Sequence, residues 1–156
     1  MNVSELDYYQ RLKSDYQTHR SLFVAFDYDN TISDYHKQGH DFTAIIDLLR
    51  ESHKLGFKLI LFTANEGLKL EQIKIDLAKR NIPFDYVNEN PIMKTSKPYY
   101  NILLDDRAGL VESYGYLRKL VDFIKLEPYS EINSFRLIKY HRSHHPNPLP
   151  YNESTN

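Results

Sequence analysis

The chain of 156 residues contains no cysteine. This absence excludes disulfide bonds, thiol nucleophiles and zinc sites with sulfur ligands. A metal ion bound by this chain would therefore have oxygen or imidazole ligands.

Long apolar runs and an excess of charge are absent as well. No apolar run approaches the roughly 20 residues that span a bilayer, and residues 1–16 lack the apolar core of a signal peptide. We therefore expect a cytoplasmic protein that makes no membrane contact. The charges of the 20 basic and 21 acidic residues nearly cancel, so no global positive field favours non-specific binding to nucleic acid. Nucleic acid is therefore considered only as a possible substrate.

The sequence has the composition of one globular domain, with 41% apolar and 26% charged residues. Apolar runs of strand length alternate with segments that repeat apolar residues at helical spacing. This alternation predicts a three-layer α/β fold with a mainly parallel sheet and right-handed crossovers. The predicted strands cover residues 22–26, 58–65, 84–87 and 101–106, and the predicted helices cover 4–19, 41–54, 67–80 and 110–124.

Local signals place several boundaries. Ser4 is a candidate N-cap for the first helix, and Gly56 is a plausible stop for the second. Residues 134–141 fit either a strand or a helical turn, whereas the polar, proline-rich residues 143–156 are typical of a flexible tail. The expected parts are an accessory N-terminal helix in 1–20, a catalytic core in 21–127 and a C-terminal extension in 128–156.

Three of the predicted strands end in side chains that carry oxygen. Asp27 and Asp29 follow the first strand, Thr63 ends the second, and Asp105 with Asp106 ends the fourth. In open parallel sheets the ligand crevice lies beyond the carboxyl ends of the strands. The topology therefore allows these five side chains to converge.

Converging carboxylates need a compensating charge, because two of them about 4 Å apart repel by roughly 4 kcal/mol at an effective dielectric constant near 20. An all-oxygen site with few protein ligands suits Mg2+, which keeps several waters and often bridges to substrate phosphate. The alternative is that Asp27 and Asp105 only cap the helices after their strands. Two acidic pairs, with Thr63 and a lysine between them in the sequence, favour the cation site.

These residues resemble the motifs of the haloacid dehalogenase (HAD) superfamily of phosphotransferases. Its Asp-x-Asp-x-Thr motif appears as DYDNT, its strand-ending Thr as LILFTA, and its acidic pair as NILLDDRAG. The sequence is more closely similar to a small capless subgroup, whose segments IPFDxVNENP, KPYAD and IDDRA compare with IPFDYVNENP and KPYYNILLDDRAG here. The resemblance covers roughly residues 22–110 and implies a Rossmann-like core without a cap domain.

The resemblance implies a chemical role for each motif residue. Asp27 would be the nucleophile that forms an aspartyl-phosphate, and Asp29 would act as general acid and then general base. Thr63 would hydrogen-bond a phosphoryl oxygen, and Lys97 would offset negative charge, although Lys94 fits relatives with a slightly longer spacing. The expected substrate-binding residues are Thr63, Ala64, Asn65, Asn88 and Glu89, and the expected metal ligands are Asp27, Asp29 through its carbonyl, Asp105 and Asp106.

Two residues of the first motif depart from the usual pattern. Asn30 stands where the superfamily usually has glycine, and asparagine enters the left-handed backbone region at modest cost. Tyr28 stands where phenylalanine is common, and we expect its ring to pack with the hydroxyl in solvent.

The gaps between motifs bear on the substrate. Residues 32–57 and 64–96 are too short to hold a cap domain. The absence of a cap favours an open site and a phosphate on a large or protruding substrate. Alternatively, an oligomer contact or the segment after Leu110 covers the site. Asn88 and Glu89 either contact the substrate or the residues that bind it, or they only shape the turn before Pro91. His36 and His40 fit solvated loop residues better than substrate ligands, and His141, His144 and His145 fit the surface of a tail better than a metal site.

The sequence thus favours a Mg2+-dependent phosphatase that acts on a phosphorylated small molecule or macromolecular end, with nucleotides and polynucleotide ends to be tried first. Hydrolysis and transfer to another acceptor are both open, as is oligomerisation. One alternative is a phosphate-accepting signalling domain, although such receivers place their acidic pair first and the phosphorylated Asp on a middle strand. The other is a binding protein that keeps the site without activity.

Overall fold

A computed structural model describes residues 7–127 of the chain. The chain divides into two compact units, Met1–Asp122 and Phe123–Asn156. The first unit holds every feature described below except the last residues of the final helix. The predictions for residues 134–141, for the tail and for its three histidines lie outside the described residues.

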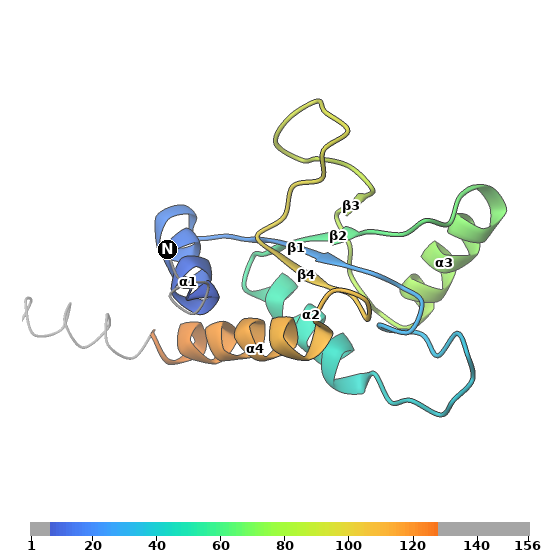
Figure 1. Ribbon diagram of the computed structural model, residues 1–156, viewed down its shortest axis with the longest axis horizontal. Coiled ribbons are helices and arrows are strands. Elements are labelled where there is room, and N and C mark those ends of the chain that lie inside the picture. The colour runs from blue at the N-terminus through green and yellow to red at the C-terminus, as the bar shows by residue number, and fades with distance from the viewer. Residues whose placement is uncertain (1–6, 128–156) are drawn as a thin grey trace, which may run out of the picture. The chain divides into compact units, whose positions relative to one another are not determined.

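A four-stranded parallel sheet forms the centre of the first unit (Figure 1). Its strands lie in the order β3-β2-β1-β4. The strands are β1 (Phe23–Phe26), β2 (Lys58–Leu61), β3 (Tyr86–Val87) and β4 (Ile102–Leu104). Helices flank the sheet, which confirms the predicted α/β fold. The observed strands are shorter than predicted, and they exclude the polar residues Thr63, Asn65, Asp105 and Asp106.

Four helices connect or precede these strands: α1 (Tyr8–His19), α2 (Thr43–Lys54), α3 (Gly67–Lys79) and α4 (Leu110–Leu126). Asp7 caps α1, because its Oδ1 accepts the backbone N–H of Gln10 at 3.0 Å, while the predicted cap Ser4 lies outside the described residues. Gly56 follows α2 with φ of +88°, as expected for a residue that ends a helix in a left-handed turn. Among residues 7–127, no helix is both long and apolar enough to cross a membrane.

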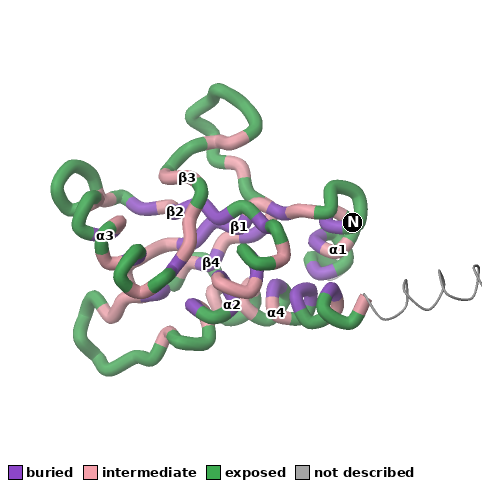
Figure 2. Tube along the Cα trace, turned by 180° about the vertical axis from the view of Figure 1, so that it is seen from behind, coloured by how far each residue is buried: buried purple, intermediate pink, exposed green. Residues whose placement is uncertain are grey.

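The core is built around the two central strands, which are buried along most of their length (Figure 2). Val24, Ala25 and Phe26 of β1 are fully buried, as are Leu59 and Leu61 of β2. Burying each large apolar side chain contributes about 1.5–3 kcal/mol. The loops after β1 and β2 therefore begin at rigid, buried strands.

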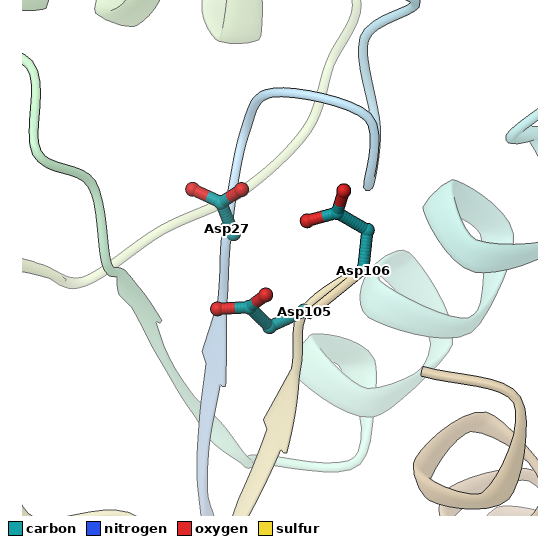
Figure 3. Close-up of side chains that lie close together, drawn as sticks. All are labelled: Asp27, Asp105 and Asp106. Carbon is teal, nitrogen blue, oxygen red and sulfur yellow. The ribbon is translucent and has the colours of Figure 1, made fainter. Parts of the chain in front are cut away.

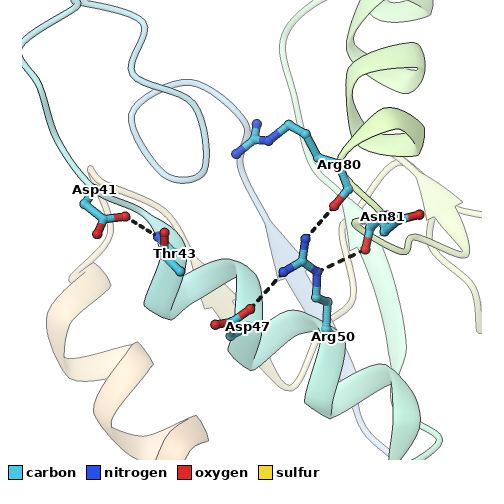
Figure 4. A network of polar contacts seen from close by, with 6 residues as sticks. All are labelled: Asp41, Thr43, Asp47, Arg50, Arg80 and Asn81. Carbon is cyan, nitrogen blue, oxygen red and sulfur yellow. Dashed lines mark hydrogen bonds and ion pairs between the residues drawn. The ribbon is translucent and has the colours of Figure 1, made fainter.

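Arg50 ties α2 to the end of α3 (Figure 4). Its guanidinium donates to the carbonyl oxygens of Arg80 and Asn81, the latter at 3.2 Å, and to Asp47 Oδ1 at 2.8 Å. The last carbonyls of a helix have no partner within the helix, so these bonds satisfy polar groups that would otherwise need water. The N–H of Thr43, at the start of α2, donates to Asp41 Oδ1 at 2.8 Å.

The first helix contacts the segments that precede β2 and β4. Tyr9, Leu12 and Tyr16 form its buried face, and the Tyr16 ring lies 5.9 Å from the ring of Phe57, which precedes β2. Asn101 Nδ2 also donates to Asp15 of α1 at 3.1 Å. The helix therefore supports the same layer that positions β4.

Candidate active site

Three carboxylates converge where β1 and β4 end (Figure 3). The backbone N–H of Asp27 donates to the carbonyl of Leu104 at 2.9 Å, which continues the pairing of β1 with β4 for one more residue. This register places Asp27 beside Asp105 and Asp106. One carboxylate oxygen from each of the three aspartates lies within 4.8 Å of the others.

The cluster is electrostatically unfavourable without a cation. Burial, together with the nearby carboxylates of Asp105, Asp29 and Asp106, raises the pKa of Asp27 to about 6, against the opposing effect of a hydrogen bond from the backbone of Tyr28. The ionised form of Asp27 is therefore less favourable in the folded protein than in water. A divalent cation among these oxygens would remove that cost.

The loop after Asp27 is a tight turn that returns towards the cluster. Asn30 adopts φ of +55°, the left-handed conformation expected for it, and its N–H donates to the carbonyl of Ser33 at 2.7 Å. The next residue, Thr31, is fully buried, and its Oγ1 accepts the backbone N–H of Asp106 at 3.1 Å. Thr31 of the Asp-x-Asp-x-Thr motif thus fixes the backbone of the acidic pair, a contact that the sequence did not reveal.

Tyr28 points away from the cluster and anchors the turn to α3. Its hydroxyl donates to Asp76 Oδ2 at 2.8 Å, and Arg80 donates both to that oxygen at 2.9 Å and to the carbonyl of Ile32 at 2.6 Å. The expectation that the Tyr28 hydroxyl faces solvent is wrong. A tyrosine stands at this position because α3 offers its hydroxyl an acceptor.

Asn65 connects the second motif to the general acid–base candidate. Its Nδ2 donates to Thr63 Oγ1 at 2.9 Å and to Asp29 Oδ2 at 3.2 Å, and its backbone N–H donates to the same Thr63 oxygen at 3.2 Å. Thr63 itself is nearly buried. Asn65, predicted to bind substrate, therefore orients Asp29 and the Thr63 hydroxyl relative to each other.

Asn88 holds the backbone of Thr63 from the other side. Its Oδ1 accepts the Thr63 N–H at 2.8 Å, and its Nδ2 donates to the Thr63 carbonyl at 2.7 Å. Asn88 also takes a left-handed φ of +51°. This geometry favours a positioning role for Asn88, whereas the exposed Glu89 beside it keeps its predicted role as a hypothesis.

The predicted motif lysines lie in the exposed loop between β3 and β4. The backbone of Lys97 accepts from Asn90 Nδ2 at 2.8 Å and donates to Thr95 Oγ1 at 3.3 Å. The described residues that line the acidic cavity include neither Lys97 nor Lys94. The choice between these two lysines stays a prediction.

The acidic cluster opens into a cavity of about 440 Å³. Asp27, Asp29, Asp105 and Asp106 line it together with Ala64 and Asn65, whereas Thr63, the fifth side chain expected at the strand ends, is not among the described residues that line it. Sequence reasoning missed Tyr35, Lys69 and Arg107, which also line the cavity, and judged His36 a solvated residue although it lies there too. Tyr35 and His36 follow the first motif, and Arg107 follows the acidic pair, so proximity in sequence could have indicated three of the four.

Comparison with known proteins supports the fold and gives no information about the chemical function. No family model and no curated protein matches the chain. The solved structure of a conserved protein from Bacteroides thetaiotaomicron is similar over 65% of this chain and 90% of that one, with a TM-score of 0.54 and 21% sequence identity. A protein from Vibrio cholerae aligns over 64% of this chain and 96% of that one, with a TM-score of 0.36 and 22% identity.

Proposed function

We propose that the chain is a Mg2+-dependent phosphoric monoester hydrolase in which Asp27 is the nucleophile. The observation that carries the proposal is the convergence of three carboxylates within 4.8 Å at the end of two parallel strands, in a cavity that Asp29 also lines. The resemblance of the same residues to the HAD motifs supports a phosphatase of that type.

The donor set fits Mg2+. All three clustered side chains offer carboxylate oxygens, the ligands that this hard cation prefers, and the pKa of Asp27 is raised first by burial and then by the neighbouring carboxylates. Asp27, Asp105 and Asp106 would hold the ion, with the carbonyl of Asp29 as a further ligand. When bound, Mg2+ supplies positive charge that offsets the negative charge of the transferring phosphoryl group.

The chain's own residues then supply the nucleophile and the proton transfers. An Asp27 oxygen attacks phosphorus and the bond to the leaving oxygen breaks, while Asp29 in its acid form donates its proton to that oxygen. Asp29, now a carboxylate, takes a proton from a water molecule, which attacks phosphorus, releases inorganic phosphate and regenerates Asp27. Asn65 donates to both Asp29 and the Thr63 hydroxyl. In this proposal the Thr63 hydroxyl donates to a phosphoryl oxygen.

The proposal leaves the acceptor and the substrate to be found by screening. Water is the acceptor in a hydrolase, and an alcohol in its place would make the same steps a transfer. A capless site would suit a phosphate that protrudes from its carrier, so mononucleotides and phosphorylated polynucleotide ends come first in a screen.

The test compares hydrolysis of a generic aryl phosphate with and without Mg2+ in wild type, Asp27→Asn and Asp47→Asn. Asp47 is exposed on α2 and does not line the cavity, so its variant is the matched control for loss of one carboxylate. We expect Mg2+-dependent turnover that falls at least about 1,000-fold in Asp27→Asn and stays near wild type in Asp47→Asn. Folded wild-type protein that turns over neither this reporter nor the nucleotide panel would overturn the proposal and favour a binding protein.

A further inference from the structure

We propose that Tyr35 and Lys69 form a recognition site for the leaving group of the substrate, and that the leaving group is a nucleoside. This inference rests on the proposed hydrolase function and names its substrate class. The predicted substrate is a phosphorylated nucleoside, either free or at the end of a nucleic acid strand, whose base stacks on the Tyr35 ring.

The first observation is an exposed aromatic ring beside an acidic site. Tyr35 lines the same cavity as Asp27 and Asp29, yet 55% of it is exposed. Tyr8 is 49% exposed as well, so the location of Tyr35 at the acidic cavity, and not its exposure alone, distinguishes it. An exposed ring at the mouth of a polar cavity offers a planar surface to a ligand, and every nucleobase has a face that stacks on such a ring.

The second observation is that neighbouring groups hold the ring in place. Lys69 Nζ lies 5.1 Å from the centre of the Tyr35 ring, and the His36 ring meets it edge to face with centres 5.2 Å apart. A cation over a tyrosine face is favourable by about 0.5–1 kcal/mol at an exposed site. Lys69 comes from the first turn of α3, so the ring is tied to the helix that follows β2.

The third observation is that the loop carrying Tyr35 is built to a fixed shape. The Tyr35 N–H donates to the carbonyl of Ser33 at 2.9 Å. Both oxygens of Asp34 accept backbone N–H groups, from Gln38 at 3.0 Å and Gly39 at 2.7 Å, and these bonds lower the pKa of Asp34. A ligand that stacks on Tyr35 would therefore lose little affinity to the cost of ordering the loop.

The charges around the cavity also fit a nucleotide. Lys69 lies on the β2 side of Asp27 and Arg107 on the β4 side, and they are the two Lys or Arg residues among the described lining residues. The Arg107 N–H donates to Asp105 Oδ1 at 2.8 Å, which fixes its backbone beside the acidic cluster. Cations on both sides of four carboxylates suit a substrate that carries several negative oxygens along with a planar group.

The experiment measures kcat/KM for a 5′-mononucleotide and for ribose 5-phosphate, which has the same ester without the base. The readout is the ratio of the two values in wild type, Tyr35→Ala, Tyr35→Phe and Lys69→Ala. Tyr8→Ala and Lys79→Ala are the matched controls, because both residues are exposed on helices and neither lines this cavity.

We expect wild type to prefer the nucleotide by roughly 10-fold or more, the range that one stacked base contributes. Tyr35→Ala should bring the ratio close to one, Tyr35→Phe should keep it, and Lys69→Ala should lower it by a smaller factor. Both controls should keep the wild-type ratio. A phosphorylated short oligonucleotide in the same assay shows whether the free nucleotide or the strand end is the better substrate.

Failure of the recognition site and failure of the hydrolase proposal give different results. Turnover of both esters with a ratio near one in wild type, or an unchanged ratio in Tyr35→Ala, would overturn the recognition site and leave the hydrolase standing. No turnover of either ester by folded wild type would overturn the hydrolase instead. In that case, nucleotide binding is compared between Asp27→Asn and the double variant Asp27→Asn/Tyr35→Ala. Binding that is lost in the double variant would still support the recognition site. Equal binding by both variants would overturn the recognition site as well.

Discussion

Charged residues are treated in opposite ways in two regions of this molecule. On the helical side, Arg118 of α4 donates to Glu51 of α2 at 2.8 Å and also pairs with Asp122, so each charge meets its opposite. At the ends of β1 and β4, Asp27 and Asp105 meet like charges instead. The first arrangement stabilises the fold, whereas the second weakens it unless a cation compensates the charge.

The contrast is sharpest in the pKa values. Hydrogen bonds to Glu51 and Asp122 raise the pKa of Arg118 and so favour its charged form. Burial raises the pKa of Asp27 to about 6 and disfavours its charged form. Sites where the fold opposes the ordinary ionisation of a group are frequent at functional positions, which is why this difference points to chemistry at the strand ends.

The largest effect expected on stability comes from adding the proposed cation. If Mg2+ binds the folded cluster and not the unfolded chain, as proposed, it should raise the unfolding free energy of the wild-type chain by about 2.7 kcal/mol at 100 times its dissociation constant. Asp105→Asn should remove most of this gain, and Asp47→Asn should keep it. Thermal unfolding with Mg2+ or a chelator measures the effect; an equal gain in all three proteins would place the ion elsewhere.

Removing a paired charge should give the next largest effect. Arg118→Met removes the ion pair between Arg118 and the partly buried Glu51, so we expect a loss of about 1–2 kcal/mol in the unfolding free energy. The exposed pair of Lys74 and Glu71 supplies the control, because Lys74→Met should cost less than about 0.5 kcal/mol. Urea unfolding of both variants measures the two losses in unfolding free energy. Equal losses would show that the Arg118 pair contributes no more than an exposed pair.

Removing one like charge should have a smaller effect of the opposite sign. Without metal at pH 7, Asp27→Asn should stabilise the fold by about 1 kcal/mol, a figure reduced to allow for solvent screening at this half-buried group. The pKa of Asp27 rises on folding, so its contribution is most favourable below pH 4 and is lost as the pH rises through about 6. The gain in Asp27→Asn should therefore grow between pH 4 and pH 7. A gain independent of pH would show that charge is not its cause.

The smallest effect is expected at the turn that carries the first motif. Asn30 already occupies the left-handed region, so Asn30→Gly should change the unfolding free energy by only a few tenths of a kcal/mol, whereas Asn30→Ala should cost about 1 kcal/mol. Chemical denaturation of both variants tests this order. A larger cost for glycine than for alanine would mean that the Asn30 side chain matters more than its backbone.

The sequence was sufficient for the features that follow from topology. Continuous apolar runs such as Leu22 to Phe26 identify buried parallel strands, and parallel strands bring their carboxyl ends to one edge, so the meeting of Asp27 with Asp105 was predictable. Asn30 was predictable for a similar reason, because few residue types tolerate a left-handed backbone.

The features that the sequence did not reveal depend on how α3 approaches the loop after β1. Tyr28 reaches Asp76, and Lys69 reaches Tyr35, across more than 30 positions of the chain. Neither pair has a spacing signal, because the rotation of a helix on a sheet is set by packing of the whole layer. The bond from Asn65 to Asp29 is of the same kind.

The measurement that tests the central claim most directly is a search for phosphate on Asp27. Wild type and Asp29→Asn would be mixed with substrate and Mg2+, quenched in acid and digested for mass spectrometry. Loss of the Asp29 carboxylate should slow attack by water, so we predict a phosphoryl group on Asp27 that accumulates in Asp29→Asn and is absent when Mg2+ is chelated. Turnover by wild type with no phosphoryl group on Asp27 in either protein, or with the group on another residue, would contradict the account.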